Sequence, residues 1–269
     1  MLTISPMPTT TLDGTKLHWR DAGRGTDAVL LLHAFPLHSG MWARQIEALS
    51  ATHRVVAPDY PGLGGSAGSH EASTMGLLAG EVRTLLAHLR IERVAVVGLS
   101  MGGYLALELW RQAPGLFTGL ALCDTKAGAD SAEAAAGRET FARNALAHGL
   151  HWVAEQMAPK LLKPSPDAAA LAEVRTLIGG GTPVGVAAAA RGMAVRPDST
   201  ATLASITCPT LVVVGEEDGL TPPAEAEKLV AGIRGARLAR IPGAGHLSNL
   251  EQPAAFNQAL AGFVAGLPS

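Results

Sequence analysis

A serine flanked by glycines stands where an apolar strand-like run meets a helix-like run. Residues 94–110 read VAVVGLSMGGYLALELW, and Ser100 lies midway between Gly98 and Gly102. A sharp turn from a buried strand into a helix would project the Ser100 hydroxyl into a cleft, and only glycines fit two residues before and after it. The pattern predicts a serine nucleophile that attacks a carbonyl carbon. A glycine-rich turn with an incidental serine is the alternative interpretation.

An acid and a histidine follow this serine in the order that such a mechanism needs. A serine hydroxyl is a weak nucleophile at neutral pH, so it requires a base and a third group that orients the base. Asp218 in TLVVVGEEDGLTPP and His246 in RIPGAGHLSNLEQP each follow a strand-like run. We predict that His246 takes the proton of Ser100 and that Asp218 orients His246. Asp218 could instead satisfy loop amides, and Asp124 in ALCDTKAG is an alternative acid.

Two backbone N–H groups are expected to bind the negative oxygen that forms during the attack. One belongs to Met101, the residue after the serine, at the predicted start of a helix. The other is expected from Phe35 in LLLHAFPLHSGMW, the loop after an earlier strand-like run. The aromatic ring of Phe35 could also line a pocket.

Strand-like runs alternate with helical patterns along most of the chain. The strand-like runs cover residues 16–23, 28–35, 53–59, 93–98, 119–124, 210–215 and 236–243, and the first is expected to be a hairpin-type edge strand. The helical patterns cover residues 41–49, 74–89, 102–112, 222–232 and 253–264, with Thr221 as the expected cap ahead of Pro222. This alternation predicts an α/β protein with a mostly parallel sheet covered on both faces. Asp218 and His246 would then lie at the carboxyl ends of strands, where such sheets keep their sites.

The alternation stops in an alanine-rich, helical stretch from about residue 126 to residue 196. We predict a helical cap at 126–196, inserted after the sixth strand into a core domain made of 1–125 and 197–269. The alternative is a set of packing helices with no role in binding. An apolar pocket with few charges is expected beneath the cap, which favours small neutral esters. The expected substrate-binding residues are Phe35, Leu37, Met157, Leu161 and Val186.

Composition excludes several other classes of protein. The chain has 269 residues, is 48% hydrophobic and carries a formal charge of −2 without a basic run, so neither nucleic acid nor an anionic membrane is expected as a partner. No apolar stretch approaches the roughly 18 residues of a membrane span, and no secretory signal is evident. The two cysteines, Cys123 and Cys208, are expected to be buried free thiols. Zinc-ligand spacing and a phosphate-binding loop are lacking, so no metal or cofactor is expected. These features predict a soluble, cytoplasmic monomer or homodimer.

The chain resembles the α/β-hydrolase superfamily over nearly its whole length. The resemblance rests on HAFPLHSGMW, PDYPGLGGS, GLSMGGYLAL, GEEDGLTPP and PGAGHLSNLEQP, in this order. The stretches LALCDTKAGADSAEAAAGR and GMAVRPDST look like a subgroup of bacterial carboxylesterases that includes a thermophile esterase from Thermogutta, and they are also similar to 3-oxoadipate enol-lactonases. The resemblance implies an α/β-hydrolase fold with a helical cap. Related enzymes that use an aspartate nucleophile are excluded by Ser100.

These residues predict a serine-dependent carboxylesterase that works through an acyl-enzyme and cleaves small carboxylic esters with short acyl or aryl groups. The same groups would serve a lactonase of the enol-lactonase type, or a cofactor-free perhydrolase in a side activity. A ligand-binding module on an inactive hydrolase scaffold is the alternative from a different class of protein. That alternative would expect a member of the trio Ser100, Asp218 and His246 to be missing.

Overall fold

The sheet is mostly parallel, as the alternation of strands and helices predicts. The computed structural model describes residues 8–268 apart from 13–14, 26 and 69. Its sheet has 8 strands in the order β1-β2-β4-β3-β5-β6-β7-β8. The strands are β1 (Thr9–Leu12), β2 (Thr15–Ala22), β3 (Ala28–Leu32), β4 (Arg54–Pro58), β5 (Val94–Leu99), β6 (Phe117–Cys123), β7 (Thr210–Gly215) and β8 (Arg237–Ile241). β1, β2 and β4 pair antiparallel, and all pairs from β4 to β8 are parallel.

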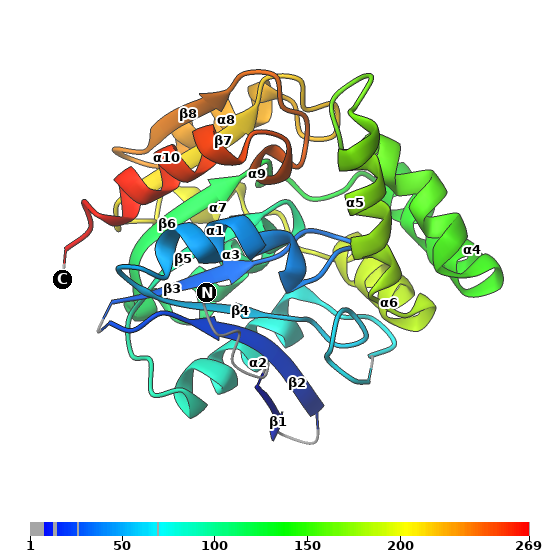
Figure 1. Ribbon diagram of the computed structural model, residues 1–269, viewed down its shortest axis with the longest axis horizontal. Helices are drawn as coiled ribbons and strands as arrows, with labels where there is room; N and C mark the ends of the chain where they lie inside the picture. Colours follow the sequence, from blue (N-terminus) through cyan, green and yellow to red (C-terminus); the bar gives the residue numbers. More distant parts are fainter. Residues whose placement is uncertain (1–7, 13–14, 26, 69, 269) are drawn as a thin grey trace.

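Helices cover both faces of this sheet (Figure 1). They are α1 (Ala43–Leu49), α2 (Met75–His88), α3 (Met101–Gln112), α7 (Thr200–Leu203), α8 (Pro223–Gly232), α9 (Ser248–Glu251) and α10 (Pro253–Val264), with short 3₁₀ turns at Ser39–Trp42, Pro114–Leu116 and Ala158–Lys160. α2 packs beside α3, and α1 packs beside α10. The inner strands β3, β5 and β7 are buried at every residue, because helices lie against both sides of them.

The predicted insertion is helical and lies between β6 and β7. It holds α4 (Ala132–Met157), α5 (Ala168–Gly179) and α6 (Pro183–Ala194), which gather beyond one end of the sheet (Figure 1). α6 lies directly on the loops of the core at two glycines. A Cβ atom at Gly185 would collide with the carbonyl oxygen of Gly62, and one at Gly192 with that of Ser73. Thr182 secures this contact, since its N–H and its hydroxyl both donate to the Gly62 oxygen at 2.9 Å.

Two local predictions are wrong. Residues 16–23 were expected to form the edge strand, but β2 lies between β1 and β4, because Thr9–Leu12 adds a further strand outside it. Thr221 was expected to cap the helix that follows it, but α8 has Pro222 at its N-cap and the Thr221 hydroxyl donates to Asp218.

The two cysteines, Cys123 and Cys208, are free as expected, although Cys208 is only half-buried.

No helix in the part of the chain that the structure describes is a candidate membrane span. None of the helices there combines the length and the apolar character that a bilayer span requires.

A buried histidine fixes the loop that follows β3. The ring of His33 stacks on Tyr60 with centroids 3.8 Å apart. Its Nε2 accepts the Tyr60 N–H at 3.3 Å, so its Nδ1–H donates to the Ala34 oxygen at 3.0 Å. Burial lowers the pKa of His33 to about 4. His33 is therefore neutral at physiological pH, and its protonation would remove the acceptor that the Tyr60 N–H needs.

The low pKa of His33 makes the stability of the fold dependent on pH. Between the folded pKa of about 4 and the ordinary value of 6.5, the unfolded chain binds more protons than the folded chain. The free energy of unfolding is therefore expected to fall by about 3 kcal/mol from this group as the pH falls through that window. Denaturant unfolding at pH 7 and pH 4.5 measures the change, which should be smaller in His33→Gln. The exposed His148→Gln is the matched control, and an equal pH dependence in His33→Gln and the parent would contradict the assignment.

Candidate functional site

The backbone turns sharply at Ser100, between β5 and α3. Ser100 has φ 56° and ψ −114°, a conformation that L-residues rarely adopt. A Cβ atom at Gly98 would collide with the Gly102 oxygen, and one at Gly102 with the Leu32 oxygen. The glycines on both sides of the serine are therefore required by close backbone contacts, as the sequence analysis proposes. The Ser100 hydroxyl stands at the carboxyl end of β5, where α3 begins.

Ser100, His246 and Asp218 form one continuous chain of hydrogen bonds. The Ser100 Oγ lies 2.8 Å from His246 Nε2, and His246 Nδ1 lies 2.8 Å from Asp218 Oδ2. All three residues are buried, with exposed fractions of 8%, 3% and 3% in that order. The three groups come from the carboxyl ends of β5, β8 and β7, which are parallel and therefore end at the same edge of the sheet. The arrangement allows an imidazole to take a proton from the Ser100 hydroxyl while a carboxylate holds its other nitrogen.

Loop donors hold the Asp218 carboxylate in the ionised form. Its Oδ1 accepts the N–H groups of Leu220 at 2.8 Å and Thr221 at 3.0 Å, and its Oδ2 accepts the Thr221 hydroxyl at 2.7 Å. Burial by itself would raise the pKa of Asp218, but the bonds from His246 and Thr221 outweigh it and lower the pKa. Thr221 also lies 3.2 Å from His246 Nδ1. This role of Thr221 was not predicted, although a threonine three residues after the acid is a signal for such a side-chain bond.

Asp124, the alternative acid, does not reach the histidine. Its Oδ1 accepts the Gly215 N–H at 2.8 Å, and its Oδ2 bonds the Ser248 hydroxyl. Full burial, together with the nearby charge of Asp218, raises the pKa of Asp124 well above its ordinary value. Asp124 therefore links the end of β7 to the loop that carries His246, and its hydrogen bonds go to these segments rather than to the imidazole. The other candidates beside Asp218, Glu216 and Glu217, are exposed.

The loop that carries His246 is also tied to the helical insertion. The Leu247 N–H donates to the Leu161 oxygen at 3.0 Å. The Glu251 carboxylate accepts the N–H groups of Gly245 at 2.7 Å and Lys163 at 2.9 Å, so one side chain joins both segments. The position of the histidine therefore depends on the insertion as well as on the sheet.

Two candidate backbone donors are Met101, which directly follows the serine, and Phe35, which lines the same cavity. In the part of the chain that the structure describes, the Met101 N–H and the Phe35 N–H have no protein acceptor. Met101 is the first residue of α3, where the helix dipole favours negative charge. Phe35 follows the His33–Ala34 segment that the stack on Tyr60 holds in place. These are the two N–H groups that the sequence analysis names.

A cavity of about 150 Å³ lies beside Ser100 and His246. Predicted residues Phe35, Met157 and Leu161 line it, together with Met193. Leu37 and Val186 were also expected to line it, but both side chains are fully buried in the hydrophobic core instead. Val186 lies on α6, whose alanine-rich sequence does not reveal which of its apolar side chains face the cavity, and Leu37 lies in the loop after β3, where no periodic pattern indicates a direction.

The cavity also contains charges that were not expected. Lys126, from the segment after β6, and Arg138, from α4, both line it. Their side chains are 29% and 26% exposed, respectively. The expectation of a pocket with few charges is therefore wrong. The reason is that α4 turns Arg138 into the cavity, an orientation that a weakly amphipathic helix does not indicate in its sequence.

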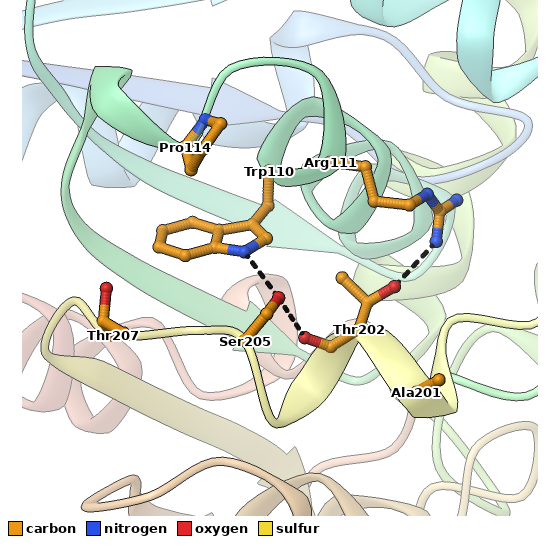
Figure 2. A pocket seen from close by; sticks show the side chains of 7 residues that line it. All are labelled: Trp110, Arg111, Pro114, Ala201, Thr202, Ser205 and Thr207. Atoms are coloured by element: carbon orange, nitrogen blue, oxygen red, sulfur yellow. Dashed lines mark hydrogen bonds between the residues drawn. The ribbon is translucent and has the colours of Figure 1, made fainter.

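A larger hollow lies elsewhere on the surface, at the far end of α3 (Figure 2). Trp110 Nε1 donates there to the Ser205 hydroxyl at 3.1 Å, and Ser205 in turn donates to the Thr202 oxygen at 2.7 Å. Trp110 stands ten residues after Ser100, which places it roughly 15 Å along the helix axis. Trp110, Ser205 and Thr202 are thus bonded to one another, whereas the cavity at Ser100 holds the hydrogen-bonded serine and histidine and is the candidate site. Among the described residues, no cluster of His, Cys, Asp or Glu is placed to bind a metal ion.

Comparisons with known proteins identify the fold family. Residues 27–253 match the family described as alpha/beta hydrolase fold. The chain is 39% identical to a thermophilic esterase from Thermogutta terrifontis, solved with malate bound, with a TM-score of 0.91 over 96% of this chain and 97% of the other. It is 31% identical to 3-oxoadipate enol-lactonase 1 of Acinetobacter baylyi, over 89% of each chain. It is 29% identical to the enol-lactonase of Burkholderia xenovorans, with a TM-score of 0.88 over 96% of this chain and 100% of the other. The predicted fold and resemblance are thus confirmed, and the chain belongs to the α/β-hydrolase fold family.

Proposed function

We propose that this protein is a serine hydrolase that cleaves small carboxylic esters through an acyl-enzyme. The observation that carries the proposal is the continuous chain Asp218–His246–Ser100, with both hydrogen bonds at 2.8 Å and the serine hydroxyl at a cavity. A role in ligand binding alone would not require a buried carboxylate, an imidazole and a strained serine in mutual contact.

The hydrogen bonds assign a step to each group. His246 donates its Nδ1–H to Asp218, so its Nε2 is free to accept the proton of Ser100 as the Ser100 oxygen attacks the ester carbonyl. Asp218 stabilises the imidazolium that results. The imidazolium then gives its proton to the leaving alkoxide, and an ester bond to Ser100 remains. Water, deprotonated by His246, attacks this ester and releases the acid.

The free N–H groups of Phe35 and Met101 suit the negative oxygen of the tetrahedral intermediate. Donors that are fixed before the reaction need no reorganisation when the charge develops, and removal of one such donor typically lowers kcat by about 10²–10³-fold. The His33–Tyr60 stack holds the Phe35 loop, and α3 holds Met101.

Lactone hydrolysis is the second candidate function. A lactone is a cyclic ester, so the same groups would open it without an additional residue. The enol-lactonases of Acinetobacter baylyi and Burkholderia xenovorans align with this chain along most of its length, which favours a lactone among its substrates. The esterase of Thermogutta terrifontis has the higher identity and favours an open-chain ester.

Replacement of the nucleophile tests the proposal directly. Ser100→Ala is expected to lower kcat for p-nitrophenyl acetate by several orders of magnitude, because the attacking oxygen is lost while the fold is retained. A fluorophosphonate probe should label the parent at Ser100 and leave Ser100→Ala unlabelled. Thermal unfolding of both proteins controls for folding. Unchanged turnover in the folded Ser100→Ala protein would overturn the proposal.

The two buried aspartates are expected to respond differently to the same substitution. Asp218→Asn would place an amide N–H against His246 and favour the wrong tautomer, and a loss of about 10⁴-fold in kcat is expected by analogy with other serine enzymes. Asp124→Asn keeps an oxygen for the Gly215 N–H and offers an N–H to the Ser248 hydroxyl, so kcat should fall by less than about tenfold. Steady-state kinetics on both variants decide the matter, and the reverse ranking would make Asp124 the acid.

The small cavity is expected to limit the acyl group. A series of p-nitrophenyl esters from acetate to dodecanoate should show the highest kcat/KM at short chains, since a volume of about 150 Å³ holds few carbon atoms. A parallel series of γ- and δ-lactones would rank ring opening against cleavage of open-chain esters. A maximum at long fatty acyl chains would show that the cavity does not limit the substrate.

A further inference from the structure

Two cations line the same cavity as the serine nucleophile. Lys126 follows β6 by three residues, and Arg138 lies in the second turn of α4. The remaining lining is largely apolar, with Phe35, Met157 and Met193 among its members. Positive side chains beside an apolar pocket suit a ligand that carries a carbon chain and a negative group.

The protein neutralises these cations only in part. Asp130 ion-pairs with Arg138, with Arg196 at 2.8 Å and with Lys126 at 3.9 Å. Among the residues that the structure describes, Asp130 is the one carboxylate paired with this group. One carboxylate therefore pairs directly with three cations, and Asp198 adds a weaker electrostatic attraction to Arg196 alone. The hydrogen bonds from Arg138 and Arg196 outweigh burial and keep the pKa of Asp130 low, so this carboxylate stays ionised.

Arg196 is buried and held through its two terminal nitrogens, although its Nε has no hydrogen-bond partner among the described residues, whereas the other two cations are partly exposed. The Arg196 side chain is 2% exposed, donates to the Met193 and Gly128 oxygens at 3.0 Å and 2.8 Å, and stacks 4.1 Å over the Tyr104 ring. It therefore anchors Asp130. The Nε–H of Arg138 donates to the Asp130 carboxylate, and no described residue accepts a hydrogen bond from the two terminal nitrogens of Arg138. Lys126 has only the 3.9 Å contact, so both cations retain donors for a ligand.

The proposed reaction gives a reason for a ligand to carry the opposite charge. His246 must become an imidazolium in the transition state, and uncompensated cations along the same partly buried cavity would oppose that charge. A negative group of the substrate, seated between Lys126 and Arg138, would offset them. Charge-assisted hydrogen bonds from a lysine and a guanidinium suit the planar oxygens of a carboxylate.

We propose that the cavity selects short esters that carry a free carboxylate, and that Lys126 and Arg138 bind this carboxylate while Ser100 attacks the ester carbonyl at the other end of the molecule. This inference rests on the proposed function for the attack, but the carboxylate site is defined by its own residues. Lys126 and Arg138 are thus assigned as substrate-binding residues.

A matched set of esters tests charge separately from size. Monomethyl glutarate carries a carboxylate. The methyl ester of glutaramic acid has an isosteric neutral amide in place of that carboxylate. Release of acid measures the turnover of both esters. The ratio of kcat/KM for the acid to that for the amide is expected to be roughly 10 to 100. This is the factor that the free energy of one hydrogen bond to a charged group corresponds to. The ratio should fall with added salt. A ratio of one or below in the parent would overturn the inference, whereas loss of all ester turnover would instead overturn the proposed function.

Variants connect that ratio to the two residues. Lys126→Gln and Arg138→Gln should each lower the ratio by about tenfold, and Arg138→Lys should restore part of it. Arg143→Gln, a change of the same charge on an exposed position of α4, is the control and should leave the ratio unaltered. A misfolded variant would lower turnover of both esters and leave the ratio in place. An unchanged ratio in folded Lys126→Gln and Arg138→Gln would overturn the assignment.

Binding provides a readout that needs no turnover. Calorimetry with Ser100→Ala should show glutarate bound more tightly than glutaramide, with its Kd raised about tenfold or more when Arg138→Gln is added. This result would support the carboxylate site even if no ester proved to be a substrate. Equal affinity for glutarate and glutaramide would contradict it.

Discussion

The site depends on the strained backbone at Ser100. A non-glycine residue at φ 56° and ψ −114° costs on the order of 1–3 kcal/mol, so neighbouring contacts must hold it. The Ser100 N–H donates to the Cys123 oxygen at 2.9 Å, and the Thr125 hydroxyl donates to the Ser100 oxygen at 2.8 Å. Both contacts come from β6 and the residues just after it. The serine is therefore held from the neighbouring strand, and its hydroxyl is fixed before any substrate arrives.

The same edge of the sheet supplies the other groups. Because β3, β5, β6, β7 and β8 are parallel, their carboxyl ends meet, and short loops bring Phe35, Ser100, Asp218 and His246 together. The insertion completes the edge, since Leu161 and Lys163 bond the loop around His246 through Leu247 and Glu251. A shift of the insertion would thus move both the cavity wall and the imidazole. This coupling links the shape of the cavity to the geometry of the proposed proton transfer.

The sequence predicts the features that local rules determine. The glycines around Ser100, the order of acid and histidine, and the parallel strands suffice to bring Ser100, Asp218 and His246 together, because each rule acts over a few residues or along one sheet edge. The strand Thr9–Leu12 was missed, since its short polar sequence has no apolar alternation. Lys126 and Arg138 were missed for another reason. The direction of Arg138 depends on how α4 packs, and its alanine-rich sequence carries little periodicity, whereas Lys126 lies in the irregular segment between β6 and α4.

Two buried carboxylates at neighbouring strand ends have pKa shifts in opposite directions, and their different hydrogen-bond partners explain the difference. Asp124 accepts from one N–H and bonds one hydroxyl inside the core, so burial dominates and its pKa rises. Asp218 accepts from two N–H groups and a hydroxyl and faces the imidazole, so its pKa falls. If both were ionised, their repulsion in a site of low dielectric would be costly. Asp124 joins the end of β7 to the loop that carries His246, and Asp218 is the carboxylate that contacts the imidazole. The hydrogen-bond partners of each carboxylate, rather than its place in the chain, therefore distinguish Asp124 from Asp218, the partner of His246.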